Sequence, residues 1–187
     1  MIRYQILEAI VNAMTDEIVV CNIGHPSQEL YGLRDREENF YMLGSMGLAS
    51  SIGLGIAMSK PNKKVVVIDG DGACSMNMGG LATIAHNAPS NLCVVIIDNH
   101  ANGSTGFQPT FTAGELQLDK VAKGCGIQNV RRMDDATDIA TTIQEELNTD
   151  GASVIVAKAE IGLMDNIQII PMNGVQVKQR MTKVLSS

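Results

Sequence analysis

The chain has 187 residues, of which 45% are hydrophobic and 18% are charged, with a formal net charge of −6 and a pI near 5.0. This length and hydrophobic content fit a globular protein with a sizeable core, so we expect residues 1–187 to form one domain. An acidic balance without a basic block argues against nucleic acid or an anionic membrane as the main partner. Since no run of about 18 apolar residues occurs and the start lacks the apolar stretch of a signal peptide, we expect a cytoplasmic protein with no membrane partner.

Short β-branched runs alternate with amphipathic stretches along the chain, which is typical of a parallel sheet covered by helices on both faces. We therefore predict an α/β fold, a three-layer doubly wound parallel sheet. The predicted strands are 17–22, 40–43, 64–69, 92–97, 128–131 and 152–159. The predicted helices are 3–14, a helix beginning at 28, then 48–59, 76–86, 115–123, 134–147 and 175–185.

Several local features add detail to this pattern. Ser27 is placed to cap the helix that begins at residue 28. The charged stretch 34–38 predicts a solvated loop, with a subunit contact as the alternative. Gly53 and Gly55 lie inside a small-residue helix rather than in a turn after a strand, so they indicate close helix packing and not a dinucleotide fingerprint.

The sulfur-containing residues are expected to be mostly buried. Eleven methionines stand against six aromatic residues, and core packing is the main interpretation for Met42, Met76 and Met78, with a cofactor cleft or partner surface as the alternative. The four cysteines are scattered with no CxxC, which suggests neither a zinc site nor an iron-sulfur site. Cys21 and Cys93 lie in strand-like runs and are predicted to be buried reduced thiols.

The most informative segments end two of the apolar runs. Gly70-Asp71-Gly72 follows the run at 64–69, and Asp98-Asn99 follows the run at 92–97. Because the carboxyl ends of parallel strands meet at one edge, Asp71 and Asn99 are expected to lie close together. Two hard oxygen ligands beside a glycine turn are how a Mg²⁺-diphosphate is held.

These two motifs resemble those of the diphosphate-binding domain of thiamine-diphosphate enzymes, in which Gly-Asp-Gly is followed by Asn-Asn. Asp98 replaces the first Asn, and Asn99 keeps the position that matters for the metal. The resemblance implies the thiamine-diphosphate-binding fold, with thiamine diphosphate and Mg²⁺ as cofactors. It also implies that Asp71, the Asn99 side chain and the Ala101 carbonyl bind the metal, and that Gly70, Gly72 and Ala73 contact the cofactor.

Two further segments are similar to motifs of the same family. Gly44-Ser45-Met46-Gly47 resembles the Gly-Ser-apolar-Gly motif of the decarboxylases, which implies that Met46 wedges between the two cofactor rings. The Gly44 carbonyl and the Met46 amide would then contact the aminopyrimidine, with Ser45 beside them. The turn after the first strand resembles the one that touches the diphosphate, and it contributes Gly24, His25 and Ser27.

The resemblance implies a carboxy-lyase for a small anionic 2-oxo acid. Residues 38–50 and 102–106 resemble segments of decarboxylases that act on sulfopyruvate, which implies this substrate, with CO₂ and sulfoacetaldehyde, a coenzyme M precursor, as products; the alternative substrate is phosphonopyruvate. The candidates for contact with the acid groups of the substrate are His25, His100, Asn102, Ser104 and Thr105.

The glutamate that activates the cofactor in this family lies on a separate pyrimidine-binding domain. We therefore expect no catalytic residue in this chain, and an α subunit as its partner in a hetero-oligomer, or a homo-oligomer when the chain is alone. A hypothesis of another class is a non-catalytic nucleotide-binding or regulatory module, which would show no Asp71-dependent binding of thiamine diphosphate.

Overall fold

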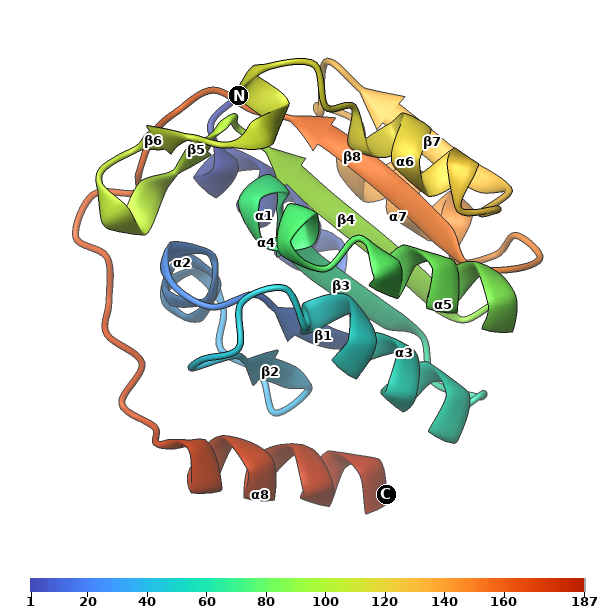
Figure 1. Ribbon diagram of the computed structural model, residues 1–187. Helices are drawn as coiled ribbons and strands as arrows, with labels where there is room; N and C mark the ends of the chain where they lie inside the picture. Colours follow the sequence, from blue (N-terminus) through green and yellow to red (C-terminus); the bar gives the residue numbers. More distant parts are fainter. Residues whose placement is uncertain (187) are drawn as a thin grey trace.

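A six-stranded parallel sheet forms the centre of the computed structural model, which describes residues 1–186 (Figure 1). Its strand order is β2-β1-β3-β4-β8-β7, and every neighbouring pair is parallel. In that order the strands are β2 (Asn39–Tyr41), β1 (Ile18–Cys21), β3 (Val65–Gly70), β4 (Leu92–Asp98), β8 (Ser153–Lys158) and β7 (Asn129–Met133). The predicted three-layer α/β fold is confirmed.

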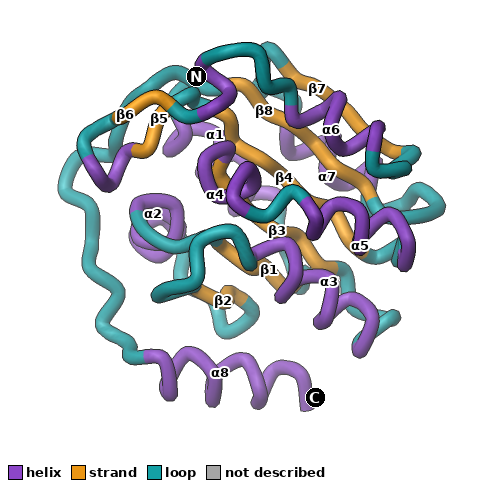
Figure 2. The backbone as a smooth tube through the Cα atoms, in the orientation of Figure 1, coloured by secondary structure: helices purple, strands orange, loops and turns teal. Residues whose placement is uncertain are grey.

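Helices cover both faces of the sheet (Figure 2). One face carries α3 (Ala49–Ser59), α4 (Asp71–Met76), α5 (Gly79–Asn87) and α6 (Leu118–Gly124). The opposite face carries α1 (Arg3–Ala13), α2 (His25–Leu33) and α7 (Ile139–Glu146). No helix within residues 1–186 is both long and apolar enough to cross a membrane.

The central strands are apolar throughout because both of their faces are covered. In β4 all seven residues are buried. Since side chains alternate along a strand, Val94 and Ile96 pack in the core under α3 to α6, and Val95 and Ile97 pack in the core under α1, α2 and α7.

The helix α3 lies close to the sheet at one of its two central glycines. A Cβ atom at Gly53 would lie 2.1 Å from Val67 Cγ2, whereas a Cβ at Gly55 would meet no atom within 4 Å. The prediction of close packing is therefore confirmed at Gly53 and is wrong at Gly55.

The last helix, α8 (Gly174–Ser186), lies beside the edge strand β2 at the end of a long connection (Figure 1). Its Arg180 pairs with Asp35 at 2.5 Å and lies over the Tyr41 ring, 5.4 Å from the centroid. The prediction of a loop at 34–38 is confirmed, and Arg34, Asp35 and Glu37 are exposed, but the stretch also binds α8, and Arg34 donates to two carbonyls of the α1 end.

Some predicted element boundaries are also wrong. The predicted helix 76–86 is two helices, because the chain turns at Asn77 between α4 and α5. The acidic residues at 134–138 precede α7 instead of forming its first turn. Ser27 does not cap α2, which begins at His25; its hydroxyl donates instead to the Cys21 and Asn22 carbonyls, at 3.1 and 2.7 Å.

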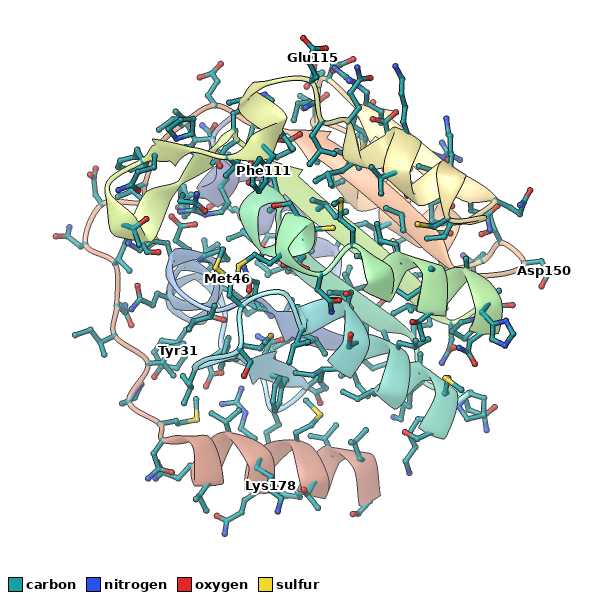
Figure 3. All side chains as sticks on the ribbon, in the orientation of Figure 1. Tyr31, Met46, Phe111, Glu115, Asp150 and Lys178 are labelled. Carbon is teal, nitrogen blue, oxygen red and sulfur yellow. The ribbon has the colours of Figure 1, made fainter. Side chains whose placement is uncertain are left out.

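The methionine and cysteine predictions have mixed outcomes. Met42 is buried and Met78 is partly buried, but Met76 is 65% exposed, so a core role for it is wrong. The prediction of buried thiols is confirmed for Cys21 and Cys93. Figure 3 shows how the remaining side chains are distributed around the sheet.

Candidate functional site

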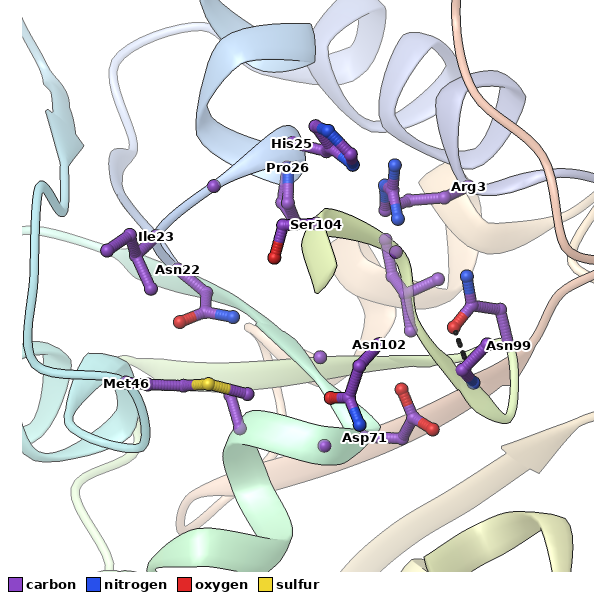
Figure 4. Close-up of a pocket in the computed structure, with 17 residues that line it drawn as sticks. Arg3, Asn22, Ile23, His25, Pro26, Met46, Asp71, Asn99, Asn102 and Ser104 are labelled. Carbon is purple, nitrogen blue, oxygen red and sulfur yellow. Dashed lines mark hydrogen bonds between the residues drawn. The ribbon is translucent and has the colours of Figure 1, made fainter. Parts of the chain in front are cut away.

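A cavity of about 310 Å³ lies where the carboxyl ends of β1, β3 and β4 meet (Figure 4). The residues that follow these strands line it, namely Asn22, Asp71 and Asn99. The three strands are neighbours, so the polar side chains at their ends converge, as ligand sites do in open α/β sheets. The structure thus brings together Asp71 and Asn99, which are 28 positions apart in the sequence.

Asp71 is the first residue of α4 and is only 3% exposed. Its Oδ2 atom accepts hydrogen bonds from the Thr110 hydroxyl at 2.5 Å and from the Thr112 hydroxyl at 2.9 Å. Burial raises the pKa of the Asp71 carboxyl, and the bonds from Thr110 and Thr112 oppose this shift by favouring the charged form. The sequence alone does not predict the contact of either threonine with Asp71. The length of the loop after Asn99 is the only feature that indicated a functional segment there.

Asp98, which replaces the first Asn of the family motif, is completely buried behind the cavity. The Lys158 ammonium pairs with its Oδ2 atom at 2.5 Å, and the Thr112 hydroxyl lies 2.7 Å from its Oδ1 atom. Thr112 therefore stands between the carboxylates of Asp71 and Asp98. This contact orients the Asp71 carboxylate, while Lys158 compensates the second negative charge.

The segment after β4 folds into a small antiparallel hairpin with two short 3₁₀ turns. It contains β5 (Ala101–Asn102), the turn Gly103–Thr105, β6 (Gln108–Pro109) and the turn Phe111–Ala113. Asn99 Oδ1 accepts from the Ala101 amide at 3.3 Å, and both residues line the cavity. The hairpin therefore places the Ala101 backbone beside the Asn99 side chain.

Three polar atoms at this cavity are buried without a hydrogen-bond partner among residues 1–186. They are Asn22 Oδ1, His25 Nδ1 and Asn99 Nδ2. An unpaired buried polar atom costs about 1–3 kcal/mol, so such atoms indicate a missing polar partner. A polar ligand in the cavity would supply it.

Glycines let the backbone approach that ligand closely. Gly24 has a φ of 89° immediately before α2, a conformation that favours glycine. A Cβ atom at Gly72 would lie 2.4 Å from Asn102 Oδ1, so a larger residue would displace the Asn102 side chain, which lines the cavity. Gly24, His25 and Pro26, at the start of the nine-residue helix α2, also line this space.

Most of the predicted site residues line this cavity. Those that do are Gly24, His25, Met46, Gly70, Asp71, Gly72, Ala73, Asn99, Ala101, Asn102 and Ser104. Ser27 does not, because its side chain is fully buried between α2 and the end of β1. Gly44 and Ser45 line a second pocket of about 190 Å³ with residues 40–43 and α8, and Met46 extends from their loop toward the first cavity (Figure 4).

His100 and Thr105 also lie outside the lining. His100 Nδ1 lies 2.8 Å from the Thr112 carbonyl oxygen, which turns the ring toward the hairpin. The Thr105 hydroxyl donates to Gln108 Oε1 at 2.7 Å. Neither side chain points to the cavity in this conformation.

Arg3 lines the cavity although no sequence pattern indicated it. It begins α1, and its Nε and Nη2 groups donate to the two carboxylate oxygens of Glu29 on α2, at 2.8 and 2.9 Å. Both side chains are buried. Arginine and glutamate 26 positions apart carry no signal of contact in one sequence.

The cavity fits a Mg²⁺-diphosphate. The Asp71 carboxylate, the Asn99 amide and the Ala101 carbonyl offer the oxygen ligands that Mg²⁺ prefers. The unpaired Nδ1 atom of His25, in the tautomer that carries its proton, can donate to an anion beside that metal, whereas Asn22 Oδ1 accepts from a donor.

Comparison with known proteins agrees with this arrangement. Residues 27–157 match the family model described as thiamine pyrophosphate enzyme, C-terminal TPP binding domain. The chain is 47% identical over 171 residues to sulfopyruvate decarboxylase subunit beta of Methanococcus maripaludis, which covers 90% of this chain and 91% of the relative. It is 50% identical over 157 residues to the protein of the same name from Methanocaldococcus jannaschii, covering 83% and 82% of the two chains.

More distant relatives share only part of their length with this chain. Phosphonopyruvate decarboxylase of Streptomyces hygroscopicus is 44% identical over 137 residues, which are 73% of this chain and 34% of that protein. A solved structure of a putative thiamin diphosphate-dependent enzyme from Mycobacterium smegmatis superimposes with a TM-score of 0.74 at 18% identity, covering 87% of this chain and 32% of that one. The chain therefore belongs to the thiamine pyrophosphate enzyme family, and within it to the group of the sulfopyruvate decarboxylase β subunits.

Proposed function

We propose that this chain is the β subunit of a sulfopyruvate decarboxylase, a cytoplasmic heteromer that uses thiamine diphosphate and Mg²⁺ and serves coenzyme M biosynthesis. Residues 1–187 form its one diphosphate-binding domain. The observation that carries the proposal is the convergence of Asp71, Asn99 and Ala101 on one cavity that Met46 also lines. Identity of 40–50% to three sulfopyruvate decarboxylase β subunits supports the choice of substrate.

In this proposal the chain holds the metal and the diphosphate. Asp71, Asn99 and the Ala101 carbonyl bind Mg²⁺, and the glycine-flanked backbone at Gly70, Gly72 and Ala73 accepts the diphosphate. Thr110 and Thr112 hold the Asp71 carboxylate in place by the two hydrogen bonds described above. Gly24 and His25 contact the anion from the α2 side.

Met46 and its neighbours orient the organic part of the cofactor. Met46 is 40% exposed and lines the cavity, so its side chain is accessible to the cofactor. Gly44 and Ser45 contribute backbone contacts from the same loop. When bound, thiamine diphosphate supplies the electron sink for decarboxylation that ordinary side chains lack.

The proposal requires a second chain. The α subunit brings the pyrimidine-binding domain and the glutamate that activates the cofactor, and this chain contributes no catalytic carboxylate of that kind. Asn102 and Ser104, which line the cavity, are the candidates here for contact with the acid groups of the 2-oxo acid.

The test is reconstitution with an α-type subunit, followed by measurement of CO₂ release from sulfopyruvate, phosphonopyruvate and pyruvate. We expect sulfopyruvate to react fastest and turnover to require both chains. Asp71→Asn should abolish binding of thiamine diphosphate with Mg²⁺, because it removes the charged metal ligand but keeps the shape of the side chain. The matched control is Asp134→Asn, since Asp134 lies on the surface.

Three results would contradict the proposal. Rapid turnover of pyruvate alone would refute the substrate, and preferred turnover of phosphonopyruvate would reassign it. Cofactor binding that does not depend on Asp71, with both chains present, would favour a non-catalytic module.

A further inference from the structure

The Arg3–Glu29 pair holds a guanidinium group rigidly at the wall of the cavity. Two nearly parallel hydrogen bonds of 2.8 and 2.9 Å join Nε and Nη2 to the carboxylate, so the plane of the guanidinium is fixed. Glu29 is completely buried, and its Oε1 atom also accepts from the Met164 amide at 3.2 Å. Residues of α1, α2 and the segment between β8 and α8 thus hold the Arg3 side chain in place.

The remaining amino group of Arg3 faces the cavity. A Cβ atom built on Gly103 would lie 3.8 Å from Arg3 Nη1 and 3.3 Å from His25 Nδ1, so both groups converge on the backbone of Gly103. Figure 4 shows Arg3 and His25 on the side of the cavity away from Met46. Among the described residues that line the cavity, Arg3 is the one lysine or arginine.

His25 carries an independent sign of a missing polar partner. Its Nδ1 atom is buried and has no hydrogen-bond partner within residues 1–186. Burial and the neighbouring Arg3 charge lower the pKa of the His25 imidazole, and the Glu29 carboxylate opposes them only in part. An anion between His25 and Arg3 would satisfy the unpaired atom and both donors at once.

The position of the pair indicates which anion binds there. The proposed metal ligands Asp71 and Asn99 border the cavity between Met46 and Arg3 (Figure 4). A ligand that bends over Met46 and binds the metal through its diphosphate therefore reaches Arg3 with its far end. We propose that Arg3 Nη1 and His25 bind the tetrahedral oxyanion at that end, the terminal phosphate of thiamine diphosphate.

This inference rests on the proposed function and adds a cofactor-binding residue to it. Arg3 lies outside residues 27–157, the part of the chain that matches the family model. Magnesium neutralises only part of the diphosphate charge, and the Nη1 group of Arg3, which Glu29 leaves free, can donate to a phosphate oxygen. The same group can donate to a sulfonate, so the substrate is the competing source of the anion.

The test uses the complex reconstituted with an α-type subunit and the paired variant Arg3→Gln with Glu29→Gln. This pair removes both charges together, so no buried carboxylate is left without its partner. Calorimetric titration with Mg²⁺ present gives the Kd of thiamine diphosphate and of thiamine monophosphate. We expect the Kd of the diphosphate to rise about 10-fold or more, and that of the monophosphate to change less than about 2-fold.

Two controls separate binding from folding. Arg132→Gln removes a surface arginine that pairs with Asp134, and it should leave both Kd values unchanged. Arg3→Lys keeps a positive charge without the fork, and it should retain part of the diphosphate affinity even if the paired variant proves unstable.

Three outcomes would overturn the inference. They are an unchanged Kd for the diphosphate, equal losses for both thiamine phosphates, and a raised KM for sulfopyruvate relative to pyruvate with an unchanged cofactor Kd. The last result would assign Arg3 to the sulfonate. If Asp71→Asn weakens cofactor binding and the Arg3 variants do not, only this inference fails; if Asp71→Asn has no effect, the proposed function fails as well.

Discussion

Replacing Gly53 by alanine tests how closely α3 packs on the sheet. The added methyl would lie 2.1 Å from Val67 Cγ2 and 3.7 Å from Leu92 Cδ1, whereas carbon atoms in contact are ordinarily about 3.5–4.0 Å apart. Relief requires a shift of α3 or a rotation of Val67, and overpacking of this kind costs about 1–3 kcal/mol. Alanine regains about 1 kcal/mol of helix propensity, so we expect a net loss of about 0–2 kcal/mol.

Gly55 is the matched control, because it lies two positions along the same helix and faces open space. Gly55→Ala should therefore stabilise the chain by up to about 1 kcal/mol. Urea unfolding followed by far-ultraviolet circular dichroism measures both changes, since the chain has no tryptophan to follow.

A compensating change makes the test more specific. Shortening the neighbour with Val67→Ala should relieve the clash, so the double variant should lose less than the sum of the two single losses, by about 0.5–3 kcal/mol. If Gly53→Ala is as stable as Gly55→Ala, or if the two losses simply add, the packing argument is wrong.

Three further changes follow from buried groups. Lys158→Met leaves the completely buried Asp98 without its ammonium partner, so it should lower the free energy of unfolding by about 3–5 kcal/mol in urea titrations. Adding Asp98→Asn should recover most of this loss, and equal stability of the single and double variants would contradict the reasoning. Burial raises the pKa of the Cys21 thiol to about 12, so mass-spectrometric mapping of mild alkylation should find half-buried Cys125 modified first, and equal rates would refute the assignment. Burial tends to raise the pKa of Glu17, but hydrogen bonds lower it below its ordinary value of 4.5. Wild type should therefore have a higher free energy of unfolding than Glu17→Gln at pH 7, and this difference should be lost below about pH 4.5 as the pH falls through the pKa of the folded chain. A difference that does not depend on pH would exclude this role.

The sequence was sufficient to predict the fold and the centre of the site because both depend on local patterns. Buried parallel strands are apolar along their whole length, so the ends of β3 and β4 can be located in the sequence. Adjacent strands then bring Asp71 and Asn99 to one edge without further information.

The supporting residues could not be predicted because their contacts depend on how irregular segments fold back. Thr110 and Thr112 reach Asp71 only because the segment after β4 forms a hairpin. Arg3 reaches the cavity only because α1 packs against α2, and no local period records that contact. The break at Asn77 was missed because Met76 and Met78 continue an apolar pattern across it.

The two edges of the sheet limit how this chain can associate with others. An unprotected edge strand is a template for pairing with another strand. At β2 the edge is occupied by α8, whose Arg180 guanidinium also contacts the Asn39 carbonyl, and at β7 it carries the exposed side chains of Arg131 and Arg132. Extension of the sheet from one molecule into the next is thus blocked on both sides, so any assembly must be built through helices and loops. Among these, the loop of Met46 and the hairpin after β4 also line the cavity.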